Sequence, residues 1–284
     1  MMKRSGVFLF FIVALCVWAG NAHAVVLETN EWTTLVRPGW AYNAPPVIDT
    51  ATNTPAGGGA LKMTCYPGVY STSMGCGRGE YNGLSGTELY VGHWIKFSSN
   101  FTYNPLSTKI DYMWTAQPSV TNNTYGAFTL REQSNGARLA VDITIQGNGQ
   151  LGPNSVTPHT VYANFNPPIQ RGEWYWLEYH VRMNDVACSG GSVACVTPNG
   201  LLEVWLNDNL QMRLTNVRWI DIAGNTWKTF LHSAEWGGGG GTIPDIQYMW
   251  YDHTVISTTR IGRPASTPSG DTTAPRSPVL NFAN

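Results

Sequence analysis

The chain has 284 residues, of which 43% are hydrophobic, 12% aromatic and only 12% charged, and its formal net charge is −1. Average soluble domains carry about 25% charged residues, so Gly, Pro, Asn, Thr and Ser have to form much of this surface. The composition excludes a disordered tail, a coiled coil and a highly charged helical bundle. The small net charge gives no general attraction to nucleic acid or to an anionic membrane.

Residues 1–24 have the pattern of a secretory signal peptide. Lys3 and Arg4 precede an apolar run that ends at Trp18, and the segment closes with Ala22-His23-Ala24. The run is shorter than the roughly 20 apolar residues that span a bilayer. We therefore expect a mature chain that starts at Val25 and is secreted or periplasmic.

Several segments after the signal peptide predict β-strands. They are rich in Val, Ile, Thr, Tyr and Trp, some alternate apolar and polar residues strictly, and Gly, Pro or Asn separates most of them. In chain order they are Leu89–Ser98, Lys109–Thr115, Tyr125–Arg131, Arg138–Ile145, Trp174–Met183, Leu201–Asn207, Thr229–Ser233 and Gln247–Ser257. No segment has a long helical period, so we expect an all-β protein, a two-sheet antiparallel β-sandwich of jelly-roll type over residues 25–263.

Residues 264–284 change to a Pro-, Ser- and Thr-rich composition that is typical of a linker or tail. Cysteines remain at 65, 76, 188 and 195, and an even number in an exported chain favours disulfides. The sequence neighbours Cys65–Cys76 and Cys188–Cys195 are the favoured pairs. Metal ligation is the alternative, but neither pair has C-x2-C spacing or a close histidine.

The segment Trp174–Met183 carries aromatic and polar residues together on one face, including Trp176, Glu178 and His180. Such a face suits sugar binding, because aromatic rings stack on pyranose rings while polar groups bind hydroxyls. The alternative is that these large side chains fill the core. His93 shares a face with apolar neighbours in its strand, which favours a core or edge position.

Some of these segments resemble strands of secreted bacterial concanavalin A-like jelly rolls, the fold of many laminarinases and polysaccharide lyases. They are Glu88–Ser98, Gly172–Asn184, Gly200–Asn207 and Tyr248–Gly262. The resemblance implies the concanavalin A-like form of the jelly roll. By itself it implies no single reaction, because lectins, hydrolases and lyases share this fold.

Arg78-Gly-Glu80 is similar to the Arg-x-Glu on an early cleft strand of the jelly-roll polysaccharide lyases. The match is partial, because Tyr81-Asn82 follow where those motifs continue with Leu-Arg. Lys109-Ile-Asp111 stands near the Gln-x-His position of alginate lyases of this fold and differs from it. Phe230–Gly237 stands near their last cleft strand and lacks its Tyr signature.

Lyase chemistry needs a group that neutralises the substrate carboxylate, a base for the C5 proton and an acid for the leaving oxygen. Arg78 suits neutralisation, because a guanidinium pairs with a carboxylate through two hydrogen bonds; a structural pairing with Glu80 is the alternative. The base and acid candidates are His232, Tyr112 and Tyr251. The expected substrate-binding residues are Glu80, Lys109, Glu235 and Trp236.

The leading hypothesis is thus a polysaccharide lyase that cleaves a uronate-containing glycan by β-elimination. The alternatives are a non-catalytic, lectin-like carbohydrate-binding protein and a glycoside hydrolase of the same fold, although no Glu-x-Asp-x-Glu run is present. We expect a monomer whose partner is a polysaccharide, possibly anionic. No metal motif stands out and we expect no cofactor, although a structural Ca2+ held by backbone carbonyls would leave no sequence signal.

Overall fold

The computed structural model describes residues 26–30, 45–69, 74–104, 107–115, 124–132, 139–147, 160–188, 195–220, 223–237 and 242–265. The expected signal peptide and most of the expected tail lie outside these residues. No helix in the described part of the chain has the length and hydropathy that a membrane crossing needs.

The described elements are all β-strands. In chain order they are β1 (Val26–Asn30), β2 (Val47–Asp49), β3 (Ala60–Cys65), β4 (Gly68–Val69), β5 (Met74–Gly86), β6 (Glu88–Phe97), β7 (Ser107–Trp114), β8 (Thr124–Glu132), β9 (Leu139–Gly147), β10 (Thr160–Asn164), β11 (Trp174–Arg182), β12 (Asp185–Val186), β13 (Val196–Thr197), β14 (Gly200–Leu206), β15 (Asn209–Val217), β16 (Trp227–Gly237), β17 (Thr242–Ile243) and β18 (Gln247–Ser257).

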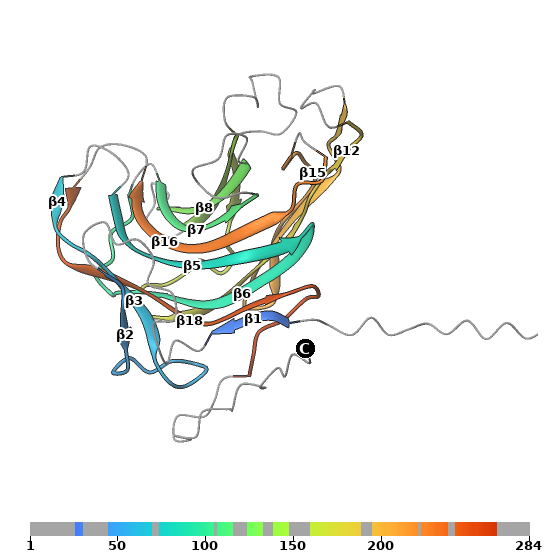
Figure 1. The fold of residues 1–284 in the computed structure, drawn as a ribbon. Coiled ribbons are helices and arrows are strands. Elements are labelled where there is room, and N and C mark those ends of the chain that lie inside the picture. The colour runs from blue at the N-terminus through green and yellow to red at the C-terminus, as the bar shows by residue number, and fades with distance from the viewer. Residues whose placement is uncertain are drawn as a thin grey trace, which may run out of the picture.

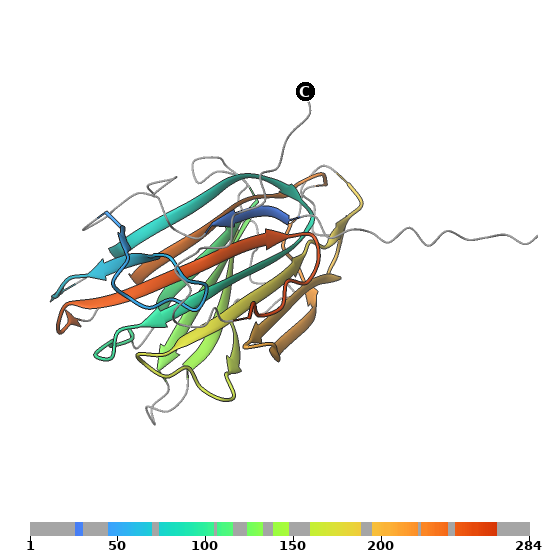
Figure 2. The same ribbon diagram turned by 90° about the horizontal axis from the view of Figure 1, so that it is seen from below.

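Two antiparallel sheets form the sandwich (Figures 1 and 2). An eight-stranded sheet has the order β15-β14-β11-β6-β18-β3-β2, with β1 paired to β18, and a six-stranded sheet has the order β10-β9-β8-β7-β16-β5. Strands distant in sequence are neighbours in both sheets, as expected for a jelly roll. The predicted all-β, two-sheet fold is confirmed.

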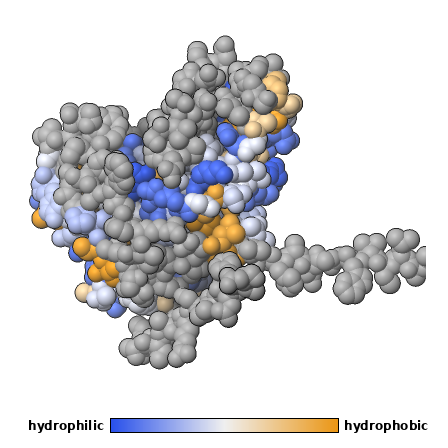
Figure 3. All heavy atoms as spheres, in the orientation of Figure 1, coloured by the Kyte–Doolittle hydropathy of each residue, from blue (hydrophilic) through white to orange (hydrophobic). Residues whose placement is uncertain are grey.

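The main hydrophobic core lies between the sheets. Strand β11 shows how it forms, because Tyr175, Leu177, Tyr179 and Val181 alternate along the strand and all belong to this core. Large hydrophobic side chains are otherwise rarely exposed, and Figure 3 shows a described surface that is largely hydrophilic with small hydrophobic patches. The sandwich therefore buries one face of each strand and leaves the opposite faces for other contacts.

Disulfides join Cys65 to Cys76, which links the end of β3 to β5, and Cys188 to Cys195, which closes the loop between β12 and β13. Both favoured pairs are confirmed. Disulfides persist in oxidising compartments, so these bonds are consistent with a protein that works outside the cytoplasm.

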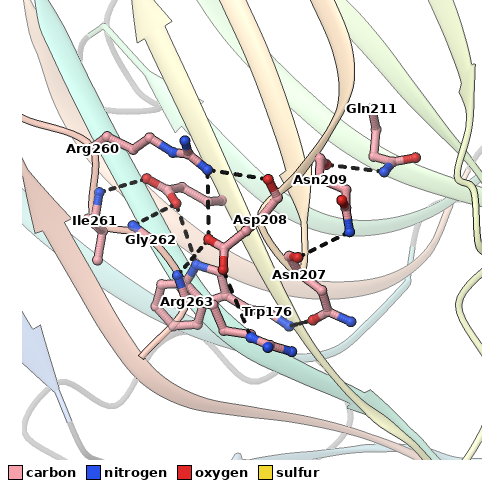
Figure 4. A network of polar contacts seen from close by, with 10 residues as sticks. Trp176, Asn207, Asp208, Asn209, Gln211, Arg260, Ile261, Gly262 and Arg263 are labelled. Atoms are coloured by element: carbon pink, nitrogen blue, oxygen red, sulfur yellow. Dashed lines mark hydrogen bonds and ion pairs between the residues drawn. The ribbon is translucent and has the colours of Figure 1, made fainter. Parts of the chain in front are cut away.

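The segment after β18 runs back across the outer face of the eight-stranded sheet (Figure 4). The buried Glu178 carboxylate of β11 accepts hydrogen bonds from the backbone N–H groups of Ile261 and Gly262, at 2.8 and 3.0 Å. Asp208 accepts another from the N–H of Arg263 at 2.8 Å. This anchored segment helps to cover the outer face of β11, where the sequence suggested sugar binding.

Strands β5, β7 and β16 of the six-stranded sheet are curved, and their concave side faces away from the eight-stranded sheet (Figure 1). The side chains that point to this concave side are not part of the main core. They form the second, smaller hydrophobic cluster of Tyr112, Leu231 and Trp114, together with the polar groups described next.

Candidate active site

Glu235 of β16 is the centre of a polar network on the concave face of the six-stranded sheet. Its Oε2 accepts hydrogen bonds from Nζ of Lys109 at 2.9 Å and from the hydroxyl of Tyr112 at 3.0 Å, both on β7. Its Oε1 accepts one from the Ser233 hydroxyl at 2.8 Å. One carboxylate thus joins a cation and a phenol through a single oxygen, so a proton has a continuous path between them.

Arg78 of β5 lies on the other side of β16, where its backbone pairs with Ser233. Its guanidinium carbon lies 4.9 Å from the centre of the Trp114 ring, and its Nε lies 3.9 Å from Oε2 of Glu80. The residue is only 8% exposed, and its Nε and Nη2 have no hydrogen-bond partner among the described residues. Guanidinium donors that are buried without a hydrogen-bond partner are costly, so a carboxylate that reached Arg78 would satisfy them.

The arginine and the Glu235 network are connected through aromatic contacts. The Trp114 ring that faces Arg78 is also in edge-to-face contact with Tyr112, with ring centroids 6.1 Å apart. Since neighbouring strands are about 4.8 Å apart, the flanking strands β5 and β7 are separated by roughly twice that distance across β16. A sugar unit bound over β16 would lie between the two groups.

Register shifts in β7 and β16 bring the network together. One shift lies between Lys109 and Asp111 in the β7–β8 pair, and another lies between His232 and Glu235 in the β16–β7 pair. A bulge adds an unpaired residue and redirects the side chains on either side of it. As a result Ile110 and Asp111 are both buried, and Lys109 lies on the same face as Tyr112.

The concave face therefore brings together many of the residues that the sequence predicted for the site. They are Arg78, Glu80, Lys109, Tyr112 and Glu235. Sequence reasoning missed Trp114 and Ser233, although each stands two residues from a predicted member in an alternating strand, a spacing that places it on the same face.

His232 differs from the expectation, because its side chain lies in the interior between the sheets and is 0% exposed. Its Nδ1 is 2.7 Å from Oδ1 of Asp111 and its Nε2 is 2.8 Å from the hydroxyl oxygen of Thr254. Burial lowers the pKa of this imidazole well below its ordinary value, and burial raises the pKa of Asp111 to about 6. A base at this place does not reach a substrate on the concave face.

Tyr251 and Trp236 also lie in the core cluster. The Tyr251 hydroxyl donates to the backbone oxygen of Ile110 at 2.8 Å, and burial raises the pKa of this phenol well above its ordinary value. Trp236 is 3% exposed and offers no open ring face for sugar stacking. Both residues therefore pack in the core, and neither has the functional position that the sequence predicted.

The mixed face of β11 is on the outer side of the eight-stranded sheet, opposite to the concave face. Trp176 and Glu178 are fully buried there, and His180 lies between the carboxylates of Glu88 and Glu203, each 2.7 Å from a ring nitrogen. The aromatic and polar residues of this strand are therefore engaged in packing and ion pairs. His93 lies in the interior, which agrees with the core position that its strand pattern favoured.

Comparison with known proteins found no matching family model and no matching curated sequence. Solved structures do match. An endo-β-1,4-glucuronan lyase from the fungus Trichoderma reesei has a TM-score of 0.61 at 13% identity, covering 83% of this chain and 96% of that one. A variant of the alginate lyase Aly36B in complex with an alginate trisaccharide has a TM-score of 0.53 at 16% identity, with coverages of 71% and 82%.

The alginate lyase vAL-1 from a Chlorella virus is a further match, with a TM-score of 0.52 at 15% identity over 82% of this chain and 99% of that one. The protein therefore has the concanavalin A-like jelly-roll fold of polysaccharide lyases. At these identities the similarity concerns the fold, and function has to be argued from the site.

Proposed function

We propose that this protein is a polysaccharide lyase that cleaves a uronate-containing glycan by β-elimination. The observation that supports this most directly is the concave face itself. It holds a guanidinium whose Nε and Nη2 have no hydrogen-bond partner among the described residues, and across β16 a connected phenol, carboxylate and ammonium. The fold is shared with lyases of glucuronan and alginate, which are polymers of uronic acids.

Arg78 is the carboxylate-neutralising group of this proposal. A guanidinium pairs with a carboxylate through two parallel hydrogen bonds and keeps its charge at any working pH. Pairing with the uronate carboxylate withdraws negative charge from it, so the neighbouring C5 proton becomes more acidic. Because Arg78 is largely removed from water, the interaction is stronger than it would be at an exposed site.

Tyr112, Glu235 and Lys109 perform the proton transfers. Tyr112 gives its proton to Oε2 of Glu235 and takes the C5 proton, while the C4–O4 bond breaks and its electrons leave with O4. The electrons of the C5–H bond form the C4=C5 double bond. Lys109 protonates O4, and the proton held by Glu235 then returns the lysine to its starting state.

A glycoside hydrolase built on the same face is less favoured by the strand register. Leu231 pairs with Glu80, and Glu235 follows four residues later on β16, which separates the two positions by about 13 Å along the strand. Retaining and inverting glycosidases hold their carboxyl groups about 5–9.5 Å apart. The Glu235 side chain is in addition held by Lys109 and Tyr112, so its carboxylate does not turn toward Glu80.

The test uses the purified mature chain on a panel of polyuronates, neutral glucans and xylans. We expect the ultraviolet absorbance of an unsaturated uronate and the number of reducing ends to rise together on a polyuronate. Tyr112→Phe should lower kcat about 10²–10⁴-fold, whereas Tyr66→Phe, which changes an exposed tyrosine at the end of β3, should not.

Other outcomes overturn the proposal in distinct ways. Reducing ends without ultraviolet absorbance would identify a hydrolase. Retention on immobilised glycan without any product would identify a binding protein.

We also propose that the lyase is exported, with residues 1–24 as the cleaved signal and residues 264–284 as a linker or tail after the domain of residues 25–263. The basic and apolar N-terminal pattern supports this, as do the disulfides. N-terminal sequencing of the protein recovered from the periplasm or medium should begin at Val25.

A further inference from the structure

Three side chains that can ligate metals meet in the interior between the two sheets. His93 comes from β6 of the eight-stranded sheet, and Asp111 and His232 come from β7 and β16 of the six-stranded sheet. One ligand atom from each residue lies within 4.8 Å of the others. All three side chains are 0% exposed.

We infer that His93, Asp111 and His232 form a binding site for one divalent ion of the zinc type, which joins the two sheets. This site is separate from the proposed lyase chemistry, because its side chains point into the core and not to the concave face.

The state of His93 is the first support. Neither Nδ1 nor Nε2 of this buried ring has a hydrogen-bond partner among the described residues, and Nε2 lies 3.3 Å from Oδ2 of Asp111. Tyr179, Phe230 and Tyr251 surround the ring, with centroids 5.6–6.2 Å away. Because buried polar groups are nearly always hydrogen-bonded, a ring nitrogen without a partner beside a carboxylate indicates an additional ligand.

The outer contacts of the other two residues are the second support. Nε2 of His232 lies 2.8 Å from the Thr254 hydroxyl oxygen, and Oδ2 of Asp111 accepts a hydrogen bond from the Tyr179 hydroxyl at 2.8 Å. Metal-bound histidines usually donate their second ring N–H to a fixed acceptor, and ligating carboxylates are themselves hydrogen-bonded. The His232 ring is also stacked on Tyr251 at 4.1 Å, which fixes its orientation.

The donor set selects the ion. Two imidazoles and one carboxylate suit Zn2+, whereas Ca2+ and Mg2+ prefer sites made of oxygen. Zinc bonds of about 2.0–2.1 Å in a tetrahedron place ligand atoms roughly 3.3 Å apart. Nδ1 of His232 lies 2.7 Å from Oδ1 of Asp111, and Nε2 of His93 lies 3.3 Å from Oδ2 of the same carboxylate. An ion between these ligand atoms requires His232 and Asp111 to move apart from their 2.7 Å contact.

A metal-free hydrogen-bonded cluster is the competing explanation, and His93→Phe distinguishes the two. Without a metal, the substitution replaces a ring whose nitrogens have no hydrogen-bond partner among the described residues by an apolar ring, which should leave stability unchanged or raise it. With a metal, it removes a ligand, so binding is lost and the melting temperature falls below that of the loaded wild type. His253→Asn is the matched control, because His253 lies outside the cluster and Asn tolerates its positive φ of 45°.

The experiment refolds the disulfide-bonded mature chain with Zn2+, removes free metal by gel filtration, and measures zinc per chain by elemental analysis. Co2+ loaded in the same way should give the visible ligand-field absorption of a low-symmetry nitrogen and oxygen site. We expect one ion per chain in the wild type and in His253→Asn, and less than about a tenth of an ion in His93→Phe. Thr254→Val, which removes the partner of His232, should weaken binding about 10- to 100-fold.

The wild type gives a decisive result even if the variants fail to fold. Absence of bound zinc and cobalt after refolding, with a melting temperature that does not respond to either ion, would overturn the inference. Zinc that is bound equally by His93→Phe would overturn it as well, because the ion would then be held elsewhere.

Discussion

Replacing Arg78 by Met removes the guanidinium from the concave face and keeps an unbranched side chain of similar reach. The folded protein loses the contact with the Trp114 ring at 4.9 Å, worth about 0.5–2 kcal/mol. It also loses the 3.9 Å ion pair with Glu80, worth about 0.2–1 kcal/mol. The substitution also removes Nε and Nη2, which are buried without a hydrogen-bond partner among the described residues; each such donor costs about 1–3 kcal/mol.

The relief of the two donors, Nε and Nη2, equals or exceeds these losses, so the free energy of unfolding should fall by no more than about 1 kcal/mol and is expected to rise. Activity should respond very differently. If Arg78 stabilises the charge that develops on the uronate, its removal should lower kcat about 10²–10³-fold, or about 2.7–4 kcal/mol of transition-state stabilisation.

Urea denaturation and initial rates of unsaturated-product formation measure the two quantities on the same preparation. Arg213→Met is the matched control, because Arg213 is an exposed arginine of the eight-stranded sheet that pairs with Glu203 of the same sheet. Its substitution should leave both the free energy of unfolding and the rate unchanged. A loss of more than about 3 kcal/mol in stability for Arg78→Met would identify a structural arginine. Activity that survives the substitution would refute the assigned role.

Further substitutions test the site and its support. Glu235→Gln keeps the shape of the side chain but removes the charge shared by its lysine and tyrosine partners; kcat should fall about 10²–10⁴-fold in steady-state assays, and a change below threefold would contradict the relay. Gly92→Ala places a methyl group of β6 2.3 Å from a Trp176 ring carbon of β11. Differential scanning calorimetry should therefore show a free energy of unfolding that is lower by about 1–3 kcal/mol; an unchanged melting temperature would mean that β6 and β11 separate easily. Replacing Cys65 and Cys76 by Ser opens a link with a sequence separation of 11 and should lower the free energy of unfolding in urea by about 2–3 kcal/mol, and a smaller loss would indicate that the reduced unfolded chain stays compact.

The alternating strands could be predicted from the sequence, but β5 could not be identified by the same pattern. Its sequence MGCGRGEYNGLSG has glycine at many of the positions where a strand normally shows apolar residues. At Gly77 the reason is close packing, since a Cβ there would lie 3.0 Å from the Met63 side chain. Only the resemblance of Arg78-Gly-Glu80 to a lyase motif indicated that a functional strand runs here.

The assignment of side chains to faces was the harder part of the prediction. In β16 both faces combine polar and apolar residues, with Phe230 and His232 on one and Leu231 and Glu235 on the other. Alternation therefore defines two faces without showing which one meets the second sheet. The sequence favoured His232 as a base because its usual pKa is near neutral, but burial between the sheets reverses that inference.

The bulge in β7 explains how one short segment serves both sides of the six-stranded sheet. Strict alternation would place Lys109 and Asp111 on one face, with Tyr112 on the other. The register shift between Lys109 and Asp111 breaks that rule, so Lys109 joins Tyr112 at Glu235 while Asp111 faces His232 in the interior. Bulges are common beside active sites, where they redirect side chains. A single local irregularity thus supplies the concave face with the proposed proton-transfer pair and the interior with the carboxylate of the inferred metal site, which is why neither group could be placed from residue spacing alone.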